Sequence, residues 1–210
     1  MVTKMLLEYE QSLMEGGAKL IGGIDEAGRG PLAGPVVVAG VIMPLEPERI
    51  IDGVNDSKKL SAKKRDKLYD EIIARAIDVQ VAVIDNRTID EINILNATKQ
   101  GMIKCVNGFK KVDCVLIDAV QLDVPVRTLS LVHGDALSYS IAAASIVAKV
   151  TRDRMMLELD KQYPQYNFAK HKGYGTADHI ARLKEYGPCP IHRRSFIGHF
   201  VDLPVDEGKQ

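Results

Sequence analysis

Hydrophobic residues along the chain gather into short runs typical of strands, separated by segments with helical spacing. Two β-rich runs, residues 19–26 and 35–44, are joined by a loop of glycine, proline and arginine and are therefore predicted to be neighbouring strands. Residues 78–85 predict a third strand. Residues 113–120 form a short, wholly apolar run of the kind that lies in the middle of a sheet. A fifth strand is predicted over residues 127–135.

Helical periodicity accounts for most of the remaining chain. A helix over residues 61–77 has Ser61 as its N-cap and an apolar face made of Leu68, Ile72 and Ala76. The next helix is predicted to begin at Thr88, because Glu91 follows three residues later in a capping-box pattern. Its apolar stripe consists of Ile92, Leu95, Met102 and Val106.

A long helix is predicted over residues 138–161, and shorter helices follow it. Its run of small residues, 142–145, allows another backbone to approach closely. Three strands, then alternating helices and strands, then a helical tail predict an α/β fold with a mixed five-stranded sheet flanked by helices and a C-terminal helical extension. We expect an N-terminal helix over 1–17, a core over 18–160 and a helical region over 161–210.

Composition places the chain among ordinary globular proteins, with 46% hydrophobic and 27% charged residues over 210 positions. The first 17 residues are broken by three glutamates, so they predict a short amphipathic helix, and we expect no signal peptide or membrane span. The cysteines, Cys105, Cys114 and Cys189, are odd in number and lack metal-ligand spacing, so we expect reduced thiols in a cytoplasmic protein.

Charge is distributed unevenly although the formal net charge is zero. Residues 161–200 carry seven Lys and Arg against two acids, together with four of the five histidines. A basic C-terminal quarter beside an acidic body suits a protein that holds a metal in one place and a phosphate backbone in another. A solvated helical surface explains the same charges equally well.

Three of the predicted strands end in carboxylates: Asp25 and Glu26 after the first, Asp118 after the fourth and Asp135 after the fifth. Sites gather at the carboxyl ends of parallel strands. Four acids brought together there would repel one another unless protons or cations lay between them. Oxygen ligands favour Mg²⁺ or Mn²⁺, and two such ions about 3.5–4 Å apart can support phosphodiester cleavage. Each acid taken singly is also explained as a strand-end or cap residue.

The loop after the first pair of acids contains Gly28, Arg29, Gly30 and Gly34. Its G-x-G-x-x-x-G spacing with two prolines is not a dinucleotide fingerprint. Glycines allow close backbone approach to a ligand, and a guanidinium beside free N–H groups can contact sugar and phosphate. A tight turn between two strands is the alternative interpretation.

At these residues the sequence resembles the bacterial type 2 ribonucleases H, the ribonuclease HII family. The resemblance covers roughly residues 18–198 and is carried by "GIDEAGRGPLAGPVVVAGVI", "NDSKKLS", "VLIDA", "GDALSYSIAAASIVAKVTRDR", "HKGYGT" and "IHRRSF". It implies a ribonuclease H-like sheet and an endonuclease that cleaves the RNA strand of RNA–DNA hybrids. The family also nicks DNA 5′ of an embedded ribonucleotide, leaving a 3′-hydroxyl and a 5′-phosphate. We therefore expect a monomer whose partner is such a hybrid or duplex, with no membrane.

The resemblance also implies roles for individual residues. The family's four metal-binding acids, which hold two Mg²⁺ or Mn²⁺ ions, map onto Asp25, Glu26, Asp118 and Asp135. Its glycine–arginine–glycine motif, which senses the 2′-hydroxyl, maps onto Gly28, Arg29 and Gly30, and its junction-sensing tyrosine maps onto Tyr174. Lys58, Lys172, Arg193 and Arg194 are expected to contact the nucleic-acid backbone, so the region over 161–210 is expected to bind substrate.

Two positions depart from the family pattern: Ala119 stands where glycine is usual, and His133 stands where lysine is common. Neither removes an expected metal ligand. Two alternatives stay open from the sequence, namely another nuclease of the same fold, such as a resolvase, and a hybrid-binding protein without catalysis.

Overall fold

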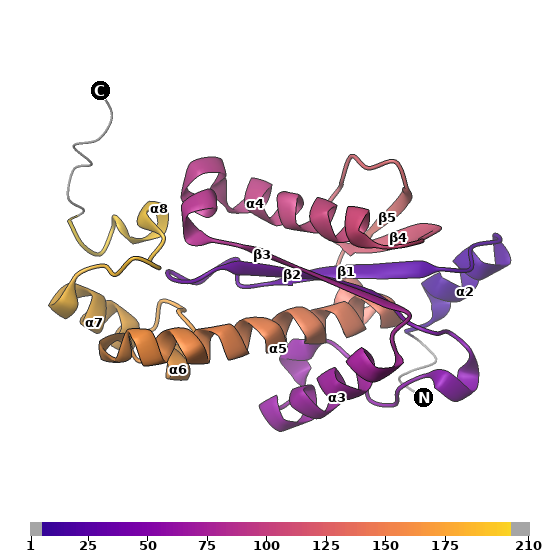
Figure 1. Cartoon of the computed structure of the whole chain (residues 1–210), viewed down its shortest axis with the longest axis horizontal. Helices are drawn as coiled ribbons and strands as arrows, with labels where there is room; N and C mark the ends of the chain where they lie inside the picture. The colour runs from indigo at the N-terminus through magenta and orange to yellow at the C-terminus, as the bar shows by residue number, and fades with distance from the viewer. Residues whose placement is uncertain (1–5, 203–210) are drawn as a thin grey trace.

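The computed structural model describes residues 6–202 and contains one five-stranded sheet with helices on both faces (Figure 1). Along the sheet the strand order is β3-β2-β1-β4-β5. β1 pairs with β2, and β2 with β3, in antiparallel register, whereas β4 runs parallel to both β1 and β5. The strands are β1 (Ile21–Ala27), β2 (Val36–Ile42), β3 (Asp78–Ile84), β4 (Cys114–Asp118) and β5 (Arg127–Leu131). The predicted mixed sheet is confirmed.

The helices form two layers around this sheet. In Figure 1 α4 (Asn86–Gly108) covers one face, while α5 (Tyr139–Gln162) and α3 (Ala62–Arg75) cover the other. α2 (Glu8–Glu15) lies near the start of β1, and a C-terminal group of short helices lies at the opposite end of the sheet. That group consists of α6 (Phe168–His171), α7 (Ala177–Tyr186) and α8 (Arg194–Ile197), preceded by a short 3₁₀ turn at Pro164–Tyr166. Three further 3₁₀ turns lie earlier in the chain, at Pro47–Arg49, Ser57–Lys59 and Gly134–Ala136. The ends of the predicted 1–17 and 161–210 regions lie outside the described residues.

The small residues of α5 let it pack directly on β1. A Cβ atom added at Gly23 would lie 2.1 Å from the carbonyl carbon of Ser140, so only glycine fits between the strand and the helix there. The alanines of α5 that follow are fully buried, as the run of small residues predicted. This close contact fixes the position of α5 relative to the acids at the end of β1.

Ser61 caps α3 as predicted, by accepting a hydrogen bond from Lys64 N at 3.3 Å. The prediction for the next helix was wrong, because α4 begins at Asn86 with Asp85 as its N-cap. The Asp85 carboxylate accepts from Thr88 N at 2.8 Å, so Thr88 lies inside the first turn. Both residue types cap helices well, and the aspartate comes first in the chain.

The N-terminal helix holds the start of α5. Glu10 is fully buried, and its Oε1 accepts from the Ser138 hydroxyl at 2.6 Å and from Ser140 N at 2.9 Å. Burial raises the pKa of this carboxyl, although both hydrogen bonds oppose the shift. The contact ties α2 to the segment that directly follows Asp135.

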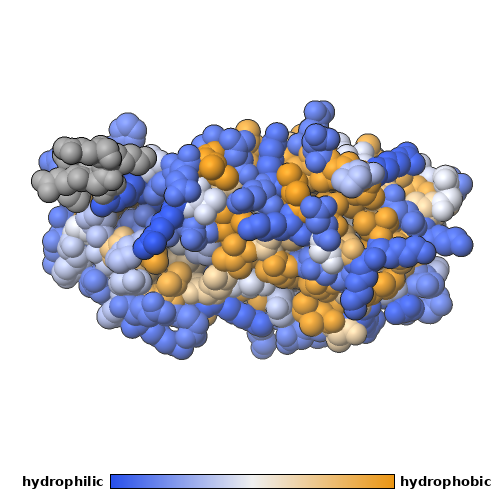
Figure 2. Space-filling view, turned by 45° about the horizontal axis from the view of Figure 1, so that its top comes forward, coloured by the Kyte–Doolittle hydropathy of each residue, from blue (hydrophilic) through white to orange (hydrophobic). Residues whose placement is uncertain are grey.

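The surface is mixed in character. On the face shown in Figure 2, apolar side chains reach the surface in several places among hydrophilic ones. Among residues 6–202, none of the helices combines the length and the hydropathy that crossing a bilayer would require.

Candidate active site

The acids predicted to act together come from three neighbouring strands of the sheet. Asp25 and Glu26 are the two residues before the last residue of β1, Ala27, and Asp118 is the last residue of β4, which runs parallel to β1. Asp135 lies in the 3₁₀ turn that follows β5. Asp25, Glu26 and Asp118 line one cavity of about 210 Å³. The expectation that parallel strands deliver carboxylates to one edge agrees with the placement of Asp25, Glu26 and Asp118, whereas Asp135 does not line this cavity.

Asp25 and Glu26 are held in a poorly solvated environment. Asp25 is 5% exposed, and its Oδ1 accepts from Glu26 N at 2.7 Å. Burial, followed by the charge of Glu26, raises the pKa of Asp25 well above its usual range. Burial also raises the pKa of Glu26, although Arg29, whose Nη1 lies 3.4 Å from Glu26 Oε1, opposes the shift. Both carboxyls would be stabilised by positive charge placed between them.

The other two acids have defined partners. Asp118 Oδ1 accepts from Gly134 N at 2.7 Å, which joins the end of β4 to the turn that carries Asp135. Asp135 is buried, and Lys58 Nζ lies 3.4 Å from its Oδ2. Burial and then the nearby charge of Asp56 raise the pKa of Asp135, whereas Lys58 opposes this. The pKa of Lys58 is raised, because attraction to Asp135, Asp25 and Asp56 outweighs the opposing effect of its partial burial.

The chemistry of this donor set fits hard divalent cations. Every candidate ligand is a carboxylate oxygen, the type that Mg²⁺ and Mn²⁺ prefer. Glu26 Oε2 is buried and lacks a hydrogen-bond partner among the described residues. This carboxylate oxygen is therefore available as a metal ligand. Within residues 6–202 no three acidic, histidine or cysteine side chains already surround a single point where a metal could bind.

The glycine loop, residues 28–35, forms one wall of the same cavity. Gly28 adopts a positive φ of 96°, and a Cβ atom there would lie 2.0 Å from Arg152 Nε, so a side chain has no room. Gly30 is different, because the nearest atom to an added Cβ would be Tyr174 Cε1 at 3.9 Å. The Arg29 side chain is 43% exposed and Tyr174 is equally exposed, and both line the cavity. The loop and Tyr174 thus share a cavity with three of the acids.

Arg193 does not occupy the place that the resemblance implied. Its side chain has no exposed surface, and its guanidinium donates to the carbonyls of Gly28, Arg29 and Gly34. A buried guanidinium cannot reach a phosphate, so the expected backbone contact is wrong for this residue. Arg193 instead contacts the glycine loop from the protein interior, through the carbonyls of the loop.

The remaining basic residues lie near the surface but apart from the acids. Lys172 is partly buried, its ammonium group donates to the Ala169 carbonyl, and it lines a separate pocket with Arg65 and Arg154. Arg194 is exposed and its main-chain N–H donates to Asp90 Oδ2 at 2.9 Å.

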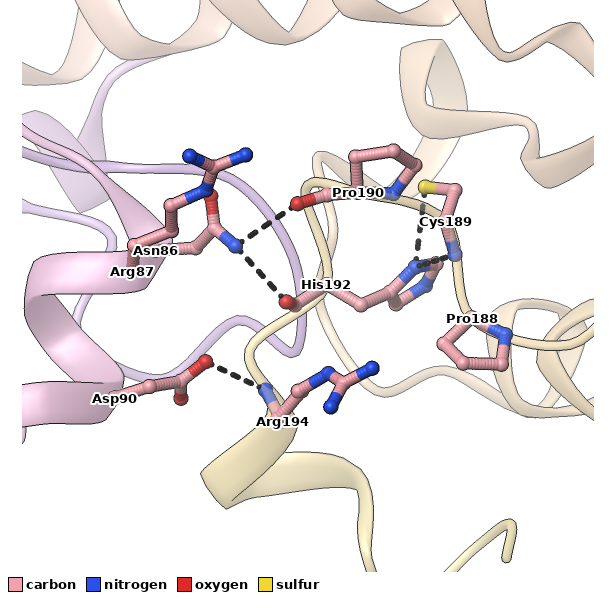
Figure 3. A pocket seen from close by; sticks show the side chains of 8 residues that line it. All are labelled: Asn86, Arg87, Asp90, Pro188, Cys189, Pro190, His192 and Arg194. Carbon is pink, nitrogen blue, oxygen red and sulfur yellow. Dashed lines mark hydrogen bonds between the residues drawn. The ribbon is translucent and has the colours of Figure 1, made fainter. Parts of the chain in front are cut away.

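Arg194 also lines a second cavity, of about 330 Å³, between the start of α4 and the 188–194 segment (Figure 3). In that cavity Asn86 Nδ2 donates to the carbonyls of Pro190 and His192, both at 3.0 Å. These bonds join the C-terminal segment to α4. Contact of Lys172 and Arg194 with nucleic acid stays a prediction.

Comparisons with known proteins identify the family and the fold. The sequence model of the family described as Ribonuclease HII matches residues 22–199. The chain belongs to the ribonuclease HII family. It is 56% identical over 195 residues to the ribonuclease HII of Acetivibrio thermocellus, an alignment that covers 92% of this chain and 75% of that protein. The family membership makes this protein a hydrolase, an endoribonuclease of the ribonuclease H type 2 class.

Solved structures of ribonucleases H2 and HII have the same fold. The crystal structure of ribonuclease H2 from Pyrococcus horikoshii OT3 superposes with a TM-score of 0.73 and 29% identity, covering 84% of this chain and 93% of that one. The ribonuclease HII in the Archaeoglobus fulgidus complex with PCNA superposes with a TM-score of 0.72 and 28% identity, covering 84% and 95%.

Three residues near the cavity were not singled out from the sequence. Lys149 lines the cavity and pairs with Asp153 at 2.7 Å, and Asp56 lies close enough to raise the pKa of Asp135. Arg152 is fully buried behind the glycine loop. Asp56 and Arg152 lie within the stretches "NDSKKLS" and "AKVTRDR" that carried the resemblance, but a charged residue in a polar or helical stretch resembles a surface residue, so only the fold reveals their positions.

Proposed function

We propose that this ribonuclease HII family member uses two divalent cations, Mg²⁺ or Mn²⁺, to hydrolyse the RNA strand of RNA–DNA hybrids. We also propose that it nicks DNA 5′ of an embedded ribonucleotide and leaves a 3′-hydroxyl and a 5′-phosphate. One observation carries the proposal: Asp25, Glu26 and Asp118 line the same cavity as Gly28, Arg29, Gly30 and Tyr174. Groups suited to hold cations therefore lie beside groups suited to contact a sugar.

The acids and Lys58 set the electrostatics of the reaction. The cations would be held through carboxylate oxygens of Asp25, Glu26, Asp118 and Asp135. Among these oxygens, Glu26 Oε2 is buried without a hydrogen-bond partner in the described residues, so a cation would satisfy it. When bound, two such ions lower the pKa of an attacking water and neutralise a departing 3′-oxygen. Lys58 reduces the repulsion at Asp135 and presents a cation to an incoming phosphate, since its side chain is 80% exposed.

The glycine loop and Tyr174 choose the sugar. Telling RNA from DNA requires contact with the 2′-hydroxyl, and the open space at Gly30 lets a ribose approach the backbone. Tyr174 is 43% exposed, and its ring offers a flat surface for the deoxyribose beyond the junction. Arg29 offers a guanidinium to the adjoining phosphate. Binding is expected to rest on shape and phosphate contacts, and so to weaken steeply with salt.

The test is a cleavage assay on a DNA duplex that contains one ribonucleotide. With Mg²⁺ or Mn²⁺ we expect a single nick on its 5′ side, with ends that a ligase can reseal, and EDTA should abolish it. A matched duplex without the ribonucleotide should remain intact. Cleavage at branched DNA instead would identify another nuclease of this fold, and tight binding without any nick would identify a hybrid-binding protein.

A further inference from the structure

Two arginines behind the glycine loop are buried without a carboxylate partner. Arg152 and Arg193 have no exposed surface, and neither forms an ion pair within residues 6–202. Burial lowers the pKa of Arg152 to about 10, and burial together with the charge of Arg152 lowers the pKa of Arg193 to about 9. Burying two cations side by side is costly, so their hydrogen bonds must provide compensation.

Arg152, on α5, joins the glycine loop to the segment that carries Tyr174. Its Nε donates to the Pro35 carbonyl at 2.9 Å and its Nη2 to the Ala33 carbonyl at 3.2 Å. Its Nη1 donates to the Lys172 carbonyl at 2.9 Å, two residues before Tyr174. The guanidinium carbon also lies 5.8 Å from the centre of the Tyr174 ring. One side chain therefore contacts both elements proposed to read the sugar.

Arg193 holds the other half of the loop. Its Nη2 donates to the Gly28 carbonyl at 2.6 Å, its Nη1 to the Arg29 carbonyl at 2.8 Å and its Nε to the Gly34 carbonyl at 3.0 Å. The two arginines together bind six main-chain carbonyls, five of them in the glycine loop. No other group in the described residues bridges this loop so completely.

The bonds leave the opposite side of the loop available. Hydrogen bonds among the described residues do not use the N–H groups of Gly28, Arg29 and Gly30, and these three residues line the cavity. Because the two arginines bind carbonyls of this loop, the N–H groups of these three residues stay available as hydrogen-bond donors. Gly28 must be glycine here because Arg152 fills the space that a side chain would need.

We propose that Arg152 and Arg193 are positioning residues for sugar recognition: they hold the carbonyls of residues 28–35 and of Lys172, so the loop and Tyr174 keep a fixed spacing. This inference rests on the proposed function. Arginine suits the role because its planar guanidinium donates in three fixed directions, whereas lysine is a flexible point charge. Neither residue touches substrate, so neither is expected to contribute to the salt dependence of binding.

The experiment compares Arg152→Lys and Arg193→Lys with Arg154→Lys as the matched control. Arg154 lies on the same helix as Arg152 but is exposed and pairs with Asp66 at 3.2 Å. The ratio of kcat/KM on a one-ribonucleotide duplex to kcat/KM on a uniform RNA–DNA hybrid measures recognition of the ribose–deoxyribose junction, which depends on the spacing of the loop and Tyr174. We expect this ratio to fall about tenfold or more in the first two variants and to change less than twofold in the control. Each variant is checked for folding by circular dichroism. If Arg193→Lys does not fold, Arg193→Gln, which keeps a neutral hydrogen-bond donor, takes its place.

A second readout separates positioning from phosphate contact. The slope of log K against log salt for duplex binding should be the same for wild type and both variants, because we expect neither arginine to contact phosphate. The loss of a phosphate contact would instead reduce the magnitude of the slope by about one. If wild type nicks the duplex, the inference is overturned by an unchanged kcat/KM ratio in folded variants or by a reduced salt slope in either of them. A wild-type protein that fails to nick would instead overturn the proposed function itself.

Discussion

The Nε2 atoms of His179 and His192 lie 3.1 Å apart in the interior of the C-terminal region. His179 Nδ1 lies 3.0 Å from the Tyr174 carbonyl, which can only accept, so this nitrogen carries a proton. His192 Nδ1 accepts from Cys189 N at 2.9 Å, so the proton of His192 lies on Nε2 and points to His179. The chain of bonds is satisfied only when both rings are neutral, and it ends at the main chain of Tyr174.

The histidine pair predicts a loss of stability in acid. Burial lowers the pKa of both His179 and His192 to about 4, whereas unfolded histidine titrates near 6.5. Between those values the unfolded state binds more protons, so the free energy of unfolding falls as the pH falls from 6.5 towards 4. His179→Gln should be less stable at pH 7 but should lose about 1 kcal/mol less than wild type between pH 7 and pH 5.

Urea unfolding followed by circular dichroism at several pH values measures this difference. His199→Gln is the matched control, because it makes the same change at an exposed histidine. A His179→Gln profile that runs parallel to wild type would show that the buried pair does not titrate in this range.

The carboxylates predict that removing one charge stabilises the metal-free protein. Asp25 is 5% exposed beside Glu26, and Asp25→Asn keeps an oxygen that can accept from Glu26 N. In EDTA at pH 8 we expect the variant to be more stable than wild type by about 1 kcal/mol or more, because a buried like charge is gone. Cleavage activity should be lost, whereas binding to an RNA–DNA hybrid should be kept.

Thermal unfolding with and without Mg²⁺ tests the same site without an activity readout. Mg²⁺ should raise the Tm of wild type, since a ligand that binds only the folded state stabilises it, and should raise that of Asp25→Asn much less. Equal Mg²⁺ effects on the two proteins would mean that Asp25 is not a ligand.

Gly28 and Gly30 predict opposite outcomes for the same substitution. Gly28→Ala places a Cβ within 2.0 Å of Arg152 Nε at a positive φ, so the variant should lose several kcal/mol of stability. Gly30→Ala meets no described atom closer than 3.9 Å, so its Tm should change by less than a few degrees. Its KM for the one-ribonucleotide duplex should nevertheless rise at least tenfold, because the methyl group occupies space that the ribose needs. A wild-type KM in Gly30→Ala would place the sugar elsewhere.

The sequence allowed the sheet and its acids to be predicted, because strand ends follow from local patterns. The apolar run before Asp118 and the parallel relation of β4 to β1 are enough to bring Asp118 close to Asp25. Ser61 was recognisable as a cap for the same local reason. The start of α4 was misplaced because Asp85 and Thr88 are both good caps, and local pattern alone does not rank them.

The roles of Arg152 and Arg193 could not be predicted, because their partners are distant in the chain. Arg193 binds the Gly28 carbonyl 165 positions away, and Arg152 binds the Pro35 carbonyl 117 positions away. Main-chain carbonyls leave no trace in a sequence, since every residue has one. An arginine that binds them is therefore indistinguishable from one that binds phosphate until the fold is known.

Ala119 predicts a stabilising substitution at the edge of the candidate site. It follows Asp118 directly and adopts a left-handed conformation with φ of 48°, while its N–H donates to the Leu131 carbonyl at 2.9 Å. This conformation explains why glycine suits the position, because a Cβ atom costs about 1–2 kcal/mol there. Ala119→Gly should therefore raise the free energy of unfolding, by about 0.5–1 kcal/mol once the greater freedom of unfolded glycine is subtracted.

Ala74→Gly is the control for that substitution, because Ala74 is an exposed residue in the last turn of α3. The same chemical change in a right-handed helical turn should lower stability, by up to about 1 kcal/mol. Urea unfolding of the two variants beside wild type should thus give shifts of opposite sign. If Ala119→Gly destabilises the protein as much as Ala74→Gly does, the backbone at residue 119 is not left-handed in solution, and the turn that holds Asp118 differs from the one described.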